Sequence, residues 1–234
     1  MPHPTRPALI AKLIVTTAAQ TVVLAALLFI PAGTLAWWRA WVFLAVVLAG
    51  TLAASAGILR VDEALLAERL KPPLQAGQSR ADRVLLPAII TAFAGQLVLV
   101  PLDVFRLHLL ARPGATISAL GLALLIAGFW IAYRGMRENA FAAPVVKHQT
   151  ERGHAVVDTG PYRVVRHPMY AGGSLVFVGT PLWLESSAAA LLAVVPIGLL
   201  VLRTLAEERF LRRELPGYAS YVERVRHRFI PLLW

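Results

Sequence analysis

The chain has 234 residues, of which 58% are hydrophobic and 15% charged, and its formal net charge is +10. This composition is typical of a membrane protein, because the apolar residues are gathered into blocks. The absence of cysteine excludes disulfides, thiolate metal sites and cysteine nucleophiles. The histidines lack the H-x-x-x-H and H-E-x-x-H spacings of zinc hydrolases, so we expect no metal.

Four apolar runs contain no Asp, Glu, Lys or Arg, and each has 18 to 20 residues. They are residues 13–30, 40–59, 84–101 and 115–133. A helix needs about 20 residues to cross the ~30 Å hydrocarbon core of a bilayer, so each run predicts a transmembrane helix. After the second run, residues 61–70 predict a short helix on the membrane surface, which Pro72 and Pro73 would stop.

Two shorter apolar runs follow, residues 171–184 and 187–202, and they predict a tight helical hairpin. The first covers only about 21 Å at ~1.5 Å per residue, so either its helix begins near Pro168 or the hairpin is partly re-entrant. The fold class that we predict is all-α, a multi-pass transmembrane helical protein of about six spans. Residues 1–134 would supply the N-terminal transmembrane helices, and residues 135–234 a loop, the hairpin and a cytoplasmic helix.

Lys and Arg are distributed unevenly between the connections. If the N-terminus is cytoplasmic, 20 of the 23 basic residues lie on the cytoplasmic side and only Arg39, Arg106 and Arg112 on the other. The positive-inside rule therefore predicts a multi-pass protein of the plasma (inner) membrane with both termini cytoplasmic. The same rule explains the net charge, so we expect the lipid bilayer as a partner and no nucleic acid.

Residues with special backbone or polar roles concentrate in residues 153–173, which read GHAVVDTGPYRVVRHPMYAGG. His167 precedes Pro168, which biases His167 out of the helical region, so the helix of the hairpin can start at Pro168 or just beyond it. Arg166 and His167 would then stand at a helix N-terminus, where free N–H groups and the positive dipole end favour a carboxylate or phosphate. A structural loop explains each residue singly, but their combination with a downstream Glu-Glu favours a site.

Glu207 and Glu208 follow the last apolar run directly. Carboxylates at the edge of the hydrocarbon are costly unless they are paired or functional. Pairing with a nearby arginine at helical spacing is an equally good explanation for Glu207, whereas we favour a functional role for Glu208. We expect the helix to continue to residue 215, to break at residues 216–217 and to restart, and residues 229–234 resemble an interfacial anchor.

Two segments, R-H-P-M-Y-A-G (residues 166–172) and E-E-R-F-L-R-R-E-L-P-G-Y-A-S-Y-V-E-R-V (residues 207–225), resemble the isoprenylcysteine carboxyl methyltransferase family. Its bacterial relatives include phospholipid methyltransferases, and the resemblance covers residues 139–234. It implies a pocket for S-adenosyl-L-methionine between the loop before the hairpin and the helix after it. The cofactor-binding residues that it implies are His154, Ala155, Val156, Gly160, Tyr162, His167, Pro168, Tyr170, Glu207 and Glu208.

The resemblance further implies an S-adenosylmethionine-dependent methyltransferase, with Arg166, His167 and Glu208 as catalytic residues. Its acceptor would be a small or lipid-like molecule, and a carboxylate, a thiol and an amine all remain open. A carboxylate is already ionised, whereas an amine or thiol must lose a proton, for which His167 or Glu208 is the nearest candidate base. Arg203 or Arg224 would anchor an acidic acceptor.

Small residues in the apolar runs have two interpretations. They permit either close helix packing or a lateral gap through which a lipid acceptor enters, and packing alone is favoured. The positions are Gly121, Gly128, Gly172, Gly173 and Gly179.

Two other functions stay open at the level of sequence. The first is an NADPH-dependent membrane reductase of the sterol or steroid type, because those enzymes have a similar Arg-His-Pro-x-Tyr segment. The second is a transporter or assembly protein without catalytic activity. We rank it last, because the long runs show neither duplicated halves nor ionisable residues near the middle of the membrane.

Overall fold

The computed structural model describes residues 5–147, 149–231 and 234, and the regular structure within them is entirely helical. The prediction of an all-α multi-pass protein is therefore confirmed. The helices are α1 Arg6–Ala32, α2 Trp38–Leu59, α3 Glu63–Arg69, α4 Asp82–Leu102, the π-helical turn η1 Asp103–Leu107, α5 Ala115–Glu138, the 3-10 turns η2 Thr150–Arg152 and η3 Gly160–Arg163, α6 Pro168–Trp183, α7 Ser187–Leu192, α8 Val194–Glu214 and α9 Tyr218–Arg224.

Among the residues that the structure describes, five helical segments are long and apolar enough to cross a membrane: α1, α2, α4 with η1, α5, and α7 with α8. The sixth predicted segment, α6, has 16 residues and is shorter than these. It begins at Pro168, the earlier of the two starts considered above. The hairpin is tight, because the Ser186 hydroxyl caps α7 by accepting from the Ala189 amide at 3.0 Å and donates to Asp103 at 2.7 Å.

The closest helix pair is α5 with α6, and it is built on glycines. A Cβ at Gly128 would lie 2.6 Å from the Gly172 carbonyl oxygen, and one at Gly179 would lie 2.6 Å from the Gly121 oxygen. Backbone therefore meets backbone, as small residues permit in membrane helix pairs. Gly173 is different, because it faces the Leu200 side chain of α8 at 3.8 Å. Four of the five glycines thus serve packing, and the α5–α6 seam is closed.

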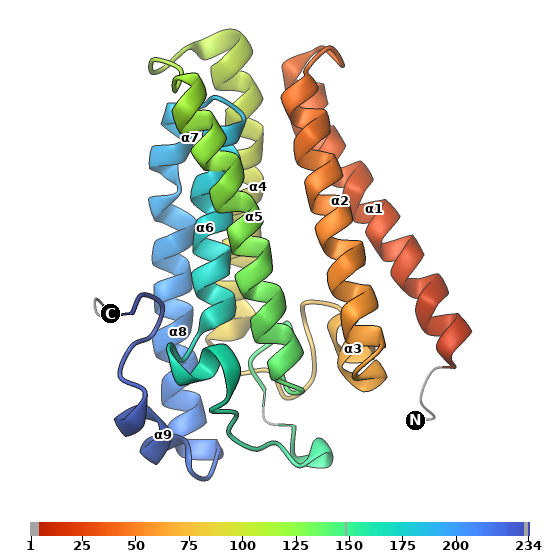
Figure 1. The fold of residues 1–234 in the computed structure, drawn as a ribbon, viewed down its shortest axis with the longest axis vertical. Helices are drawn as coiled ribbons and strands as arrows, with labels where there is room; N and C mark the ends of the chain where they lie inside the picture. Colours follow the sequence, from red (N-terminus) through yellow and green to blue (C-terminus); the bar gives the residue numbers. More distant parts are fainter. Residues whose placement is uncertain (1–4, 148, 232–233) are drawn as a thin grey trace.

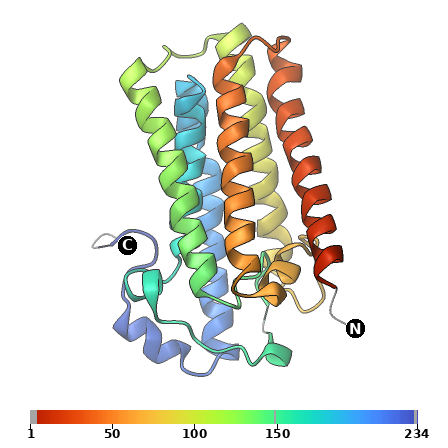
Figure 2. The ribbon, with the colours of Figure 1, turned by 45° about the vertical axis from the view of Figure 1, so that its right-hand side comes forward.

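The helices run side by side, and the polar connections gather at one end of the bundle (Figure 1). α1 and α2 stand at the side of the bundle opposite α8, where α1 packs on α4 and α2 on α5 (Figures 1 and 2). At the polar end lie α3, the connection between α5 and α6, and α9. Residues that are far apart in the chain therefore meet just beyond the ends of the long helices.

The short helix predicted at residues 61–70 is present as α3, which the Asp62 carboxylate caps by accepting from the Leu65 amide at 2.9 Å. Its Leu65 and Leu66 are buried against α1, α2 and the residues after α5. α3 therefore packs onto the polar end of the bundle, and its last residue, Arg69, reaches the connection between α5 and α6.

Candidate functional site

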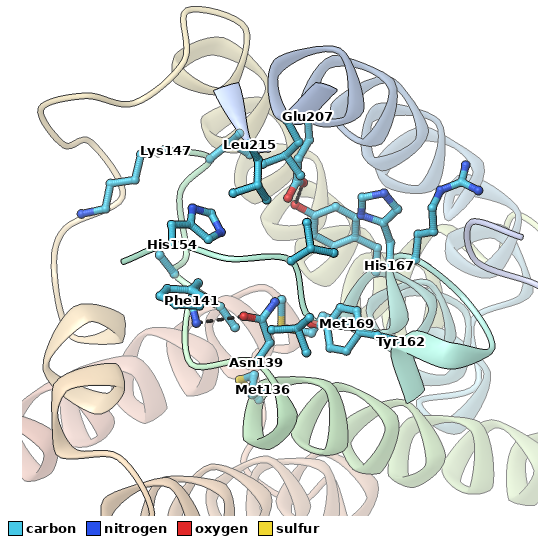
Figure 3. A pocket seen from close by; sticks show the side chains of 18 of the residues that line it. Met136, Asn139, Phe141, Lys147, His154, Tyr162, His167, Met169, Glu207 and Leu215 are labelled. Carbon is cyan, nitrogen blue, oxygen red and sulfur yellow. Dashed lines mark hydrogen bonds between the residues drawn. The ribbon is translucent and has the colours of Figure 1, made fainter. Parts of the chain in front are cut away.

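A cavity of about 350 Å³ lies at the polar end of the bundle (Figure 3). Its wall is made by the last residue of α3, the end of α5, the connection between α5 and α6, the start of α6, the second half of α8, and α9. Ala132, Met136 and Met169 form an apolar part of this wall. The volume is within the range of pockets that hold small molecules.

Aromatic rings form one side of the cavity. The rings of Phe141 and His154 lie with their centroids 4.6 Å apart and their planes tilted by 35°, and Figure 3 shows both near Asn139. The Asn139 side chain fixes this region, because its carbonyl oxygen accepts from the Phe141 amide at 2.8 Å. Tyr221 donates to the Tyr162 carbonyl at 2.9 Å. Burial raises the pKa of the Tyr162 hydroxyl, so it stays protonated at neutral pH.

The opposite side of the cavity is polar. Glu207 lines it and accepts a hydrogen bond from the Tyr170 hydroxyl. Tyr170 in turn stacks on His167, whose ring plane lies 5° from its own, and the Arg203 guanidinium lies 5.3 Å from the Tyr170 ring centroid. Aromatic and cationic groups in this arrangement attract one another. A carboxylate, a phenol, an imidazole and a guanidinium therefore share one wall.

A buried ion pair holds this wall to the rest of the protein. Arg203 donates to Asp82 at 2.6 Å and to the Pro144 carbonyl at 2.8 Å. Asp82 is 1% exposed and also accepts from the Gln78 side chain at 2.7 Å and the Val146 amide at 2.9 Å. The pair thus connects the start of α4, the middle of α8 and residues 144–146 of the cavity wall.

Glu208 lies behind the cavity, in a cluster with basic side chains. Its Oε1 accepts from Arg166 Nε at 2.7 Å and lies 3.2 Å from His167 Nε2, and its Oε2 lies 3.1 Å from Arg228 Nε. Backbone hydrogen bonds join the same two segments, because the Arg166 and His167 amides donate to the carbonyls of residues 227 and 228, each at 2.9 Å. Phe229 is buried against His167 and Tyr170. The segment predicted as an interfacial anchor, residues 229–234, therefore begins as part of the site.

The structure brings most of the predicted site residues to the cavity. Those that line it are His154, Ala155, Val156, Tyr162, Arg166, His167, Tyr170, Arg203 and Glu207. Four lie elsewhere. Gly160 faces Glu138 with φ +54°, Pro168 packs on Gly135, Glu208 is in the basic cluster, and Arg224 is exposed and paired with Asp158 at 2.8 Å.

Other lining residues have no place in the sequence prediction. Asn139, Phe141 and Lys147 come from the connection after α5, Arg69 from α3, and Tyr218 from α9. Phe141 is an aromatic residue in a connection between two helices, and Tyr218 follows a Pro-Gly break, which is a weak signal for a site. Arg69 and Lys147 gave no signal, because single basic residues near a membrane are explained by topology alone.

We expect Glu208→Gln to loosen the chain end from the site. The substitution removes the charge that Arg166, His167 and Arg228 share, and Arg166 and His167 are 5% and 7% exposed. Amide hydrogen exchange at residues 166–167 should accelerate by about tenfold or more, since a buried charge-assisted hydrogen bond contributes roughly 1.5–3 kcal/mol. Glu223→Gln, which changes an exposed carboxylate on α9, is the control. Unchanged exchange in Glu208→Gln would show that the cluster does not hold the segment.

Comparison with known protein families adds one finding. Residues 116–216 match the family model described as phospholipid methyltransferase. The match runs from the start of α5 to the residues just after α8, so it includes the start of α6 as well as Glu207 and Glu208. The match agrees with the resemblance that the two motifs carry, because that family has phospholipid methyltransferases among its bacterial relatives. No curated protein matches the chain.

Proposed function

We propose that this chain, whose residues 116–216 match the phospholipid methyltransferase family, is a membrane methyltransferase that uses S-adenosyl-L-methionine and acts on a small or lipophilic acceptor. The observation that carries the proposal is the cavity in which the R-H-P-M-Y segment meets Glu207. We further propose that this end of the bundle faces the cytoplasm, as the distribution of Lys and Arg predicts. A water-soluble cofactor would then reach the cavity directly.

The lining residues fit the cofactor. The Phe141–His154 pair and Tyr162 offer aromatic faces to an adenine ring and to a sulfonium. Among the described residues, Glu207 is the only carboxylate that lines the cavity, and none of their basic side chains lies within 4.0 Å of it. We assign Glu207 to the ammonium or the ribose hydroxyls of the cofactor, because carboxylates accept strong hydrogen bonds from such groups.

When bound, S-adenosylmethionine supplies an electrophilic methyl group. The protein has to align an acceptor with it and to keep water away. Tyr162, Tyr218 and Tyr221, each at most 6% exposed, would exclude water from the side of α9. Burial raises the pKa of each of these hydroxyls, so they present neutral groups to the cavity.

His167 is the proposed base where the acceptor is an amine or a thiol. Its Nε2 lies 3.2 Å from Glu208, so a proton on Nε2 would be donated there and Nδ1 would be left able to accept one. Glu208 is not assigned this role, because basic side chains already engage both of its oxygens and it does not line the cavity. A carboxylate acceptor would need no base. Glu208 is then a positioning residue for His167.

The apolar part of the wall, at Ala132, Met136 and Met169, would receive the lipophilic portion of the acceptor. This portion would not arrive between α5 and α6, because the glycine contacts close that seam. The backbone contacts at Gly121, Gly128, Gly172 and Gly179 leave no lateral gap there for a lipid acceptor.

We expect Glu207→Gln to weaken binding of S-adenosylhomocysteine by roughly 10- to 100-fold. The reason is the loss of a charged hydrogen-bond acceptor, which contributes roughly 1.5–3 kcal/mol, at about 1.4 kcal/mol for each tenfold change in affinity. Calorimetric titration of the purified protein in detergent measures this. Glu214→Gln, an exposed carboxylate on the same helix, should bind like the parent.

The same titrations with NADPH separate the methyltransferase from the reductase. The parent should bind S-adenosylhomocysteine and should show no saturable binding of NADPH. Binding of NADPH alone would overturn the proposed function. If Glu207→Gln bound S-adenosylhomocysteine as tightly as Glu214→Gln, the assignment of Glu207 would be wrong, whereas the proposed function would still hold.

A further inference from the structure

Arg69 is the last residue of α3, and it lines the cavity from a part of the chain that lies outside the family match. Its Nη1 donates to the Ala142 carbonyl at 2.8 Å. That bond uses one of the five N–H donors of a guanidinium. The remaining donors have no hydrogen-bond partner among the residues that the structure describes, and they are available to a group in the cavity.

The other cationic side chains of the cavity wall differ from Arg69, because each has a carboxylate partner. Lys147 pairs with Glu68, Arg166 with Glu208 at 2.7 Å, and Arg203 with Asp82 at 2.6 Å. Within the described chain, no carboxylate lies within 4.0 Å of Arg69. Arg69 is half-buried, and a guanidinium that is partly removed from water without a counter-ion is costly. Burial accordingly lowers the pKa of Arg69.

Apolar side chains lie on one side of Arg69. Its helix neighbours Leu65 and Leu66 form a buried cluster with Ala142, against which Met136 and Met169 pack. Both methionines also line the cavity. The guanidinium therefore stands at the apolar part of the wall, where an ion pair with a ligand would be stronger than in water.

We propose that Arg69 is the anion-binding residue of this cavity and that it pairs with a carboxylate of the bound ligand. The proposal rests on the proposed function and deepens it, because it assigns an acidic group to one of the two reactants. A planar guanidinium suits a carboxylate, since two parallel N–H groups can donate to its two oxygens. The carboxylate belongs either to the amino-acid part of S-adenosylmethionine or to an acidic lipophilic acceptor.

Paired probes that differ only in the acidic group test the proposal and identify its source. The first pair is S-adenosylhomocysteine and decarboxylated S-adenosylhomocysteine. The second pair is octanoate and octanamide. Each is titrated into the parent, Arg69→Gln and Arg69→Lys, with Arg60→Gln as the control, because Arg60 is exposed on the connection between α2 and α3. The ratio of affinities within a pair reports the carboxylate alone, and a variant that folds poorly would weaken both members equally.

We expect Arg69→Gln to reduce the preference for the carboxylate by roughly 10- to 100-fold in one of the two pairs. We expect Arg69→Lys, which keeps the charge but loses the bidentate geometry, to lie between this variant and the parent. A loss in the S-adenosyl pair assigns the carboxylate to the cofactor, and a loss in the octanoate pair assigns it to the acceptor. Ratios unchanged from the parent in both pairs, or an equal loss for all four probes, would overturn the proposal.

Failure of the proposed function has a different signature. If the parent bound neither S-adenosyl compound, the methyltransferase assignment would fail. The octanoate pair would still test Arg69, because it contains no cofactor.

Discussion

Asp82→Asn is expected to destabilise the protein by about 3–5 kcal/mol, because it leaves the Arg203 guanidinium buried without its counter-ion. Asp82 is 1% exposed and holds Arg203, Gln78 and the Val146 amide at the same time. Loss of this carboxylate should also release residues 144–146 from the cavity wall. Denaturation in detergent measures the first effect, and titration with S-adenosylhomocysteine measures the second.

A double substitution separates the effect of an unpaired buried charge on stability from the effect of the Arg203 hydrogen bond on the cavity wall. Asp82→Leu combined with Arg203→Met removes both charges, and a buried pair replaced by apolar residues is often as stable as the original. The double variant should therefore be more stable than Asp82→Asn, yet it should bind the cofactor analogue weakly, because the Pro144 carbonyl has lost its donor. Asp158→Asn, at an exposed ion pair, should change stability by no more than about 0.5 kcal/mol. If Asp82→Asn were as stable as this control, the pair would not hold the wall.

The sequence predicts the helices of this protein well, because length and apolar composition decide which segments cross a bilayer. The start of α6 could be placed at Pro168 for a local reason, the restriction that proline imposes on His167. The π-helical turn η1 could not be predicted, since it depends on tertiary contacts such as the hydrogen bond from Ser186 to Asp103. Buried partners such as Asp82 and Arg203 are 121 positions apart, and no local pattern connects them.

The candidate site was predictable only where its residues form short motifs. The R-H-P-M-Y segment and the Glu-Glu pair meet in the structure, since Arg166 contacts Glu208 and Tyr170 contacts Glu207. The sequence favoured Glu208 over Glu207, but Glu207 is the residue that lines the cavity. Adjacent residues on a helix point about 100° apart, and the facing of α8 is set by its neighbours, which the sequence alone does not give. The position of Arg69 in the cavity wall could not be predicted for the same reason, because it depends on how α3 packs against the connection between α5 and α6.

Gly128→Val is expected to destabilise the protein by about 3 kcal/mol and to abolish measurable binding of the cofactor analogue. A Cβ at Gly128 would lie 2.6 Å from the Gly172 carbonyl oxygen and 2.9 Å from a methyl group of Val176. Backbone cannot move aside as a flexible side chain can, so α5 and α6 would have to separate. The start of α6 carries His167, Met169 and Tyr170 into the cavity, and a shift of this helix would displace all three.

Gly198→Val is the matched control, because a Cβ at Gly198 of α8 meets no atom within 4 Å. Both variants place the same β-branched residue in an apolar helix, so their difference isolates the contact between α5 and α6. Thermal unfolding in detergent should give a lower midpoint for Gly128→Val alone, and only this variant should fail to bind S-adenosylhomocysteine. Equal behaviour of the two variants would mean that α5 and α6 tolerate a wider spacing. The geometry of the cavity would then depend on the Asp82–Arg203 pair and the Glu208 cluster, which hold the polar connections independently of the glycines.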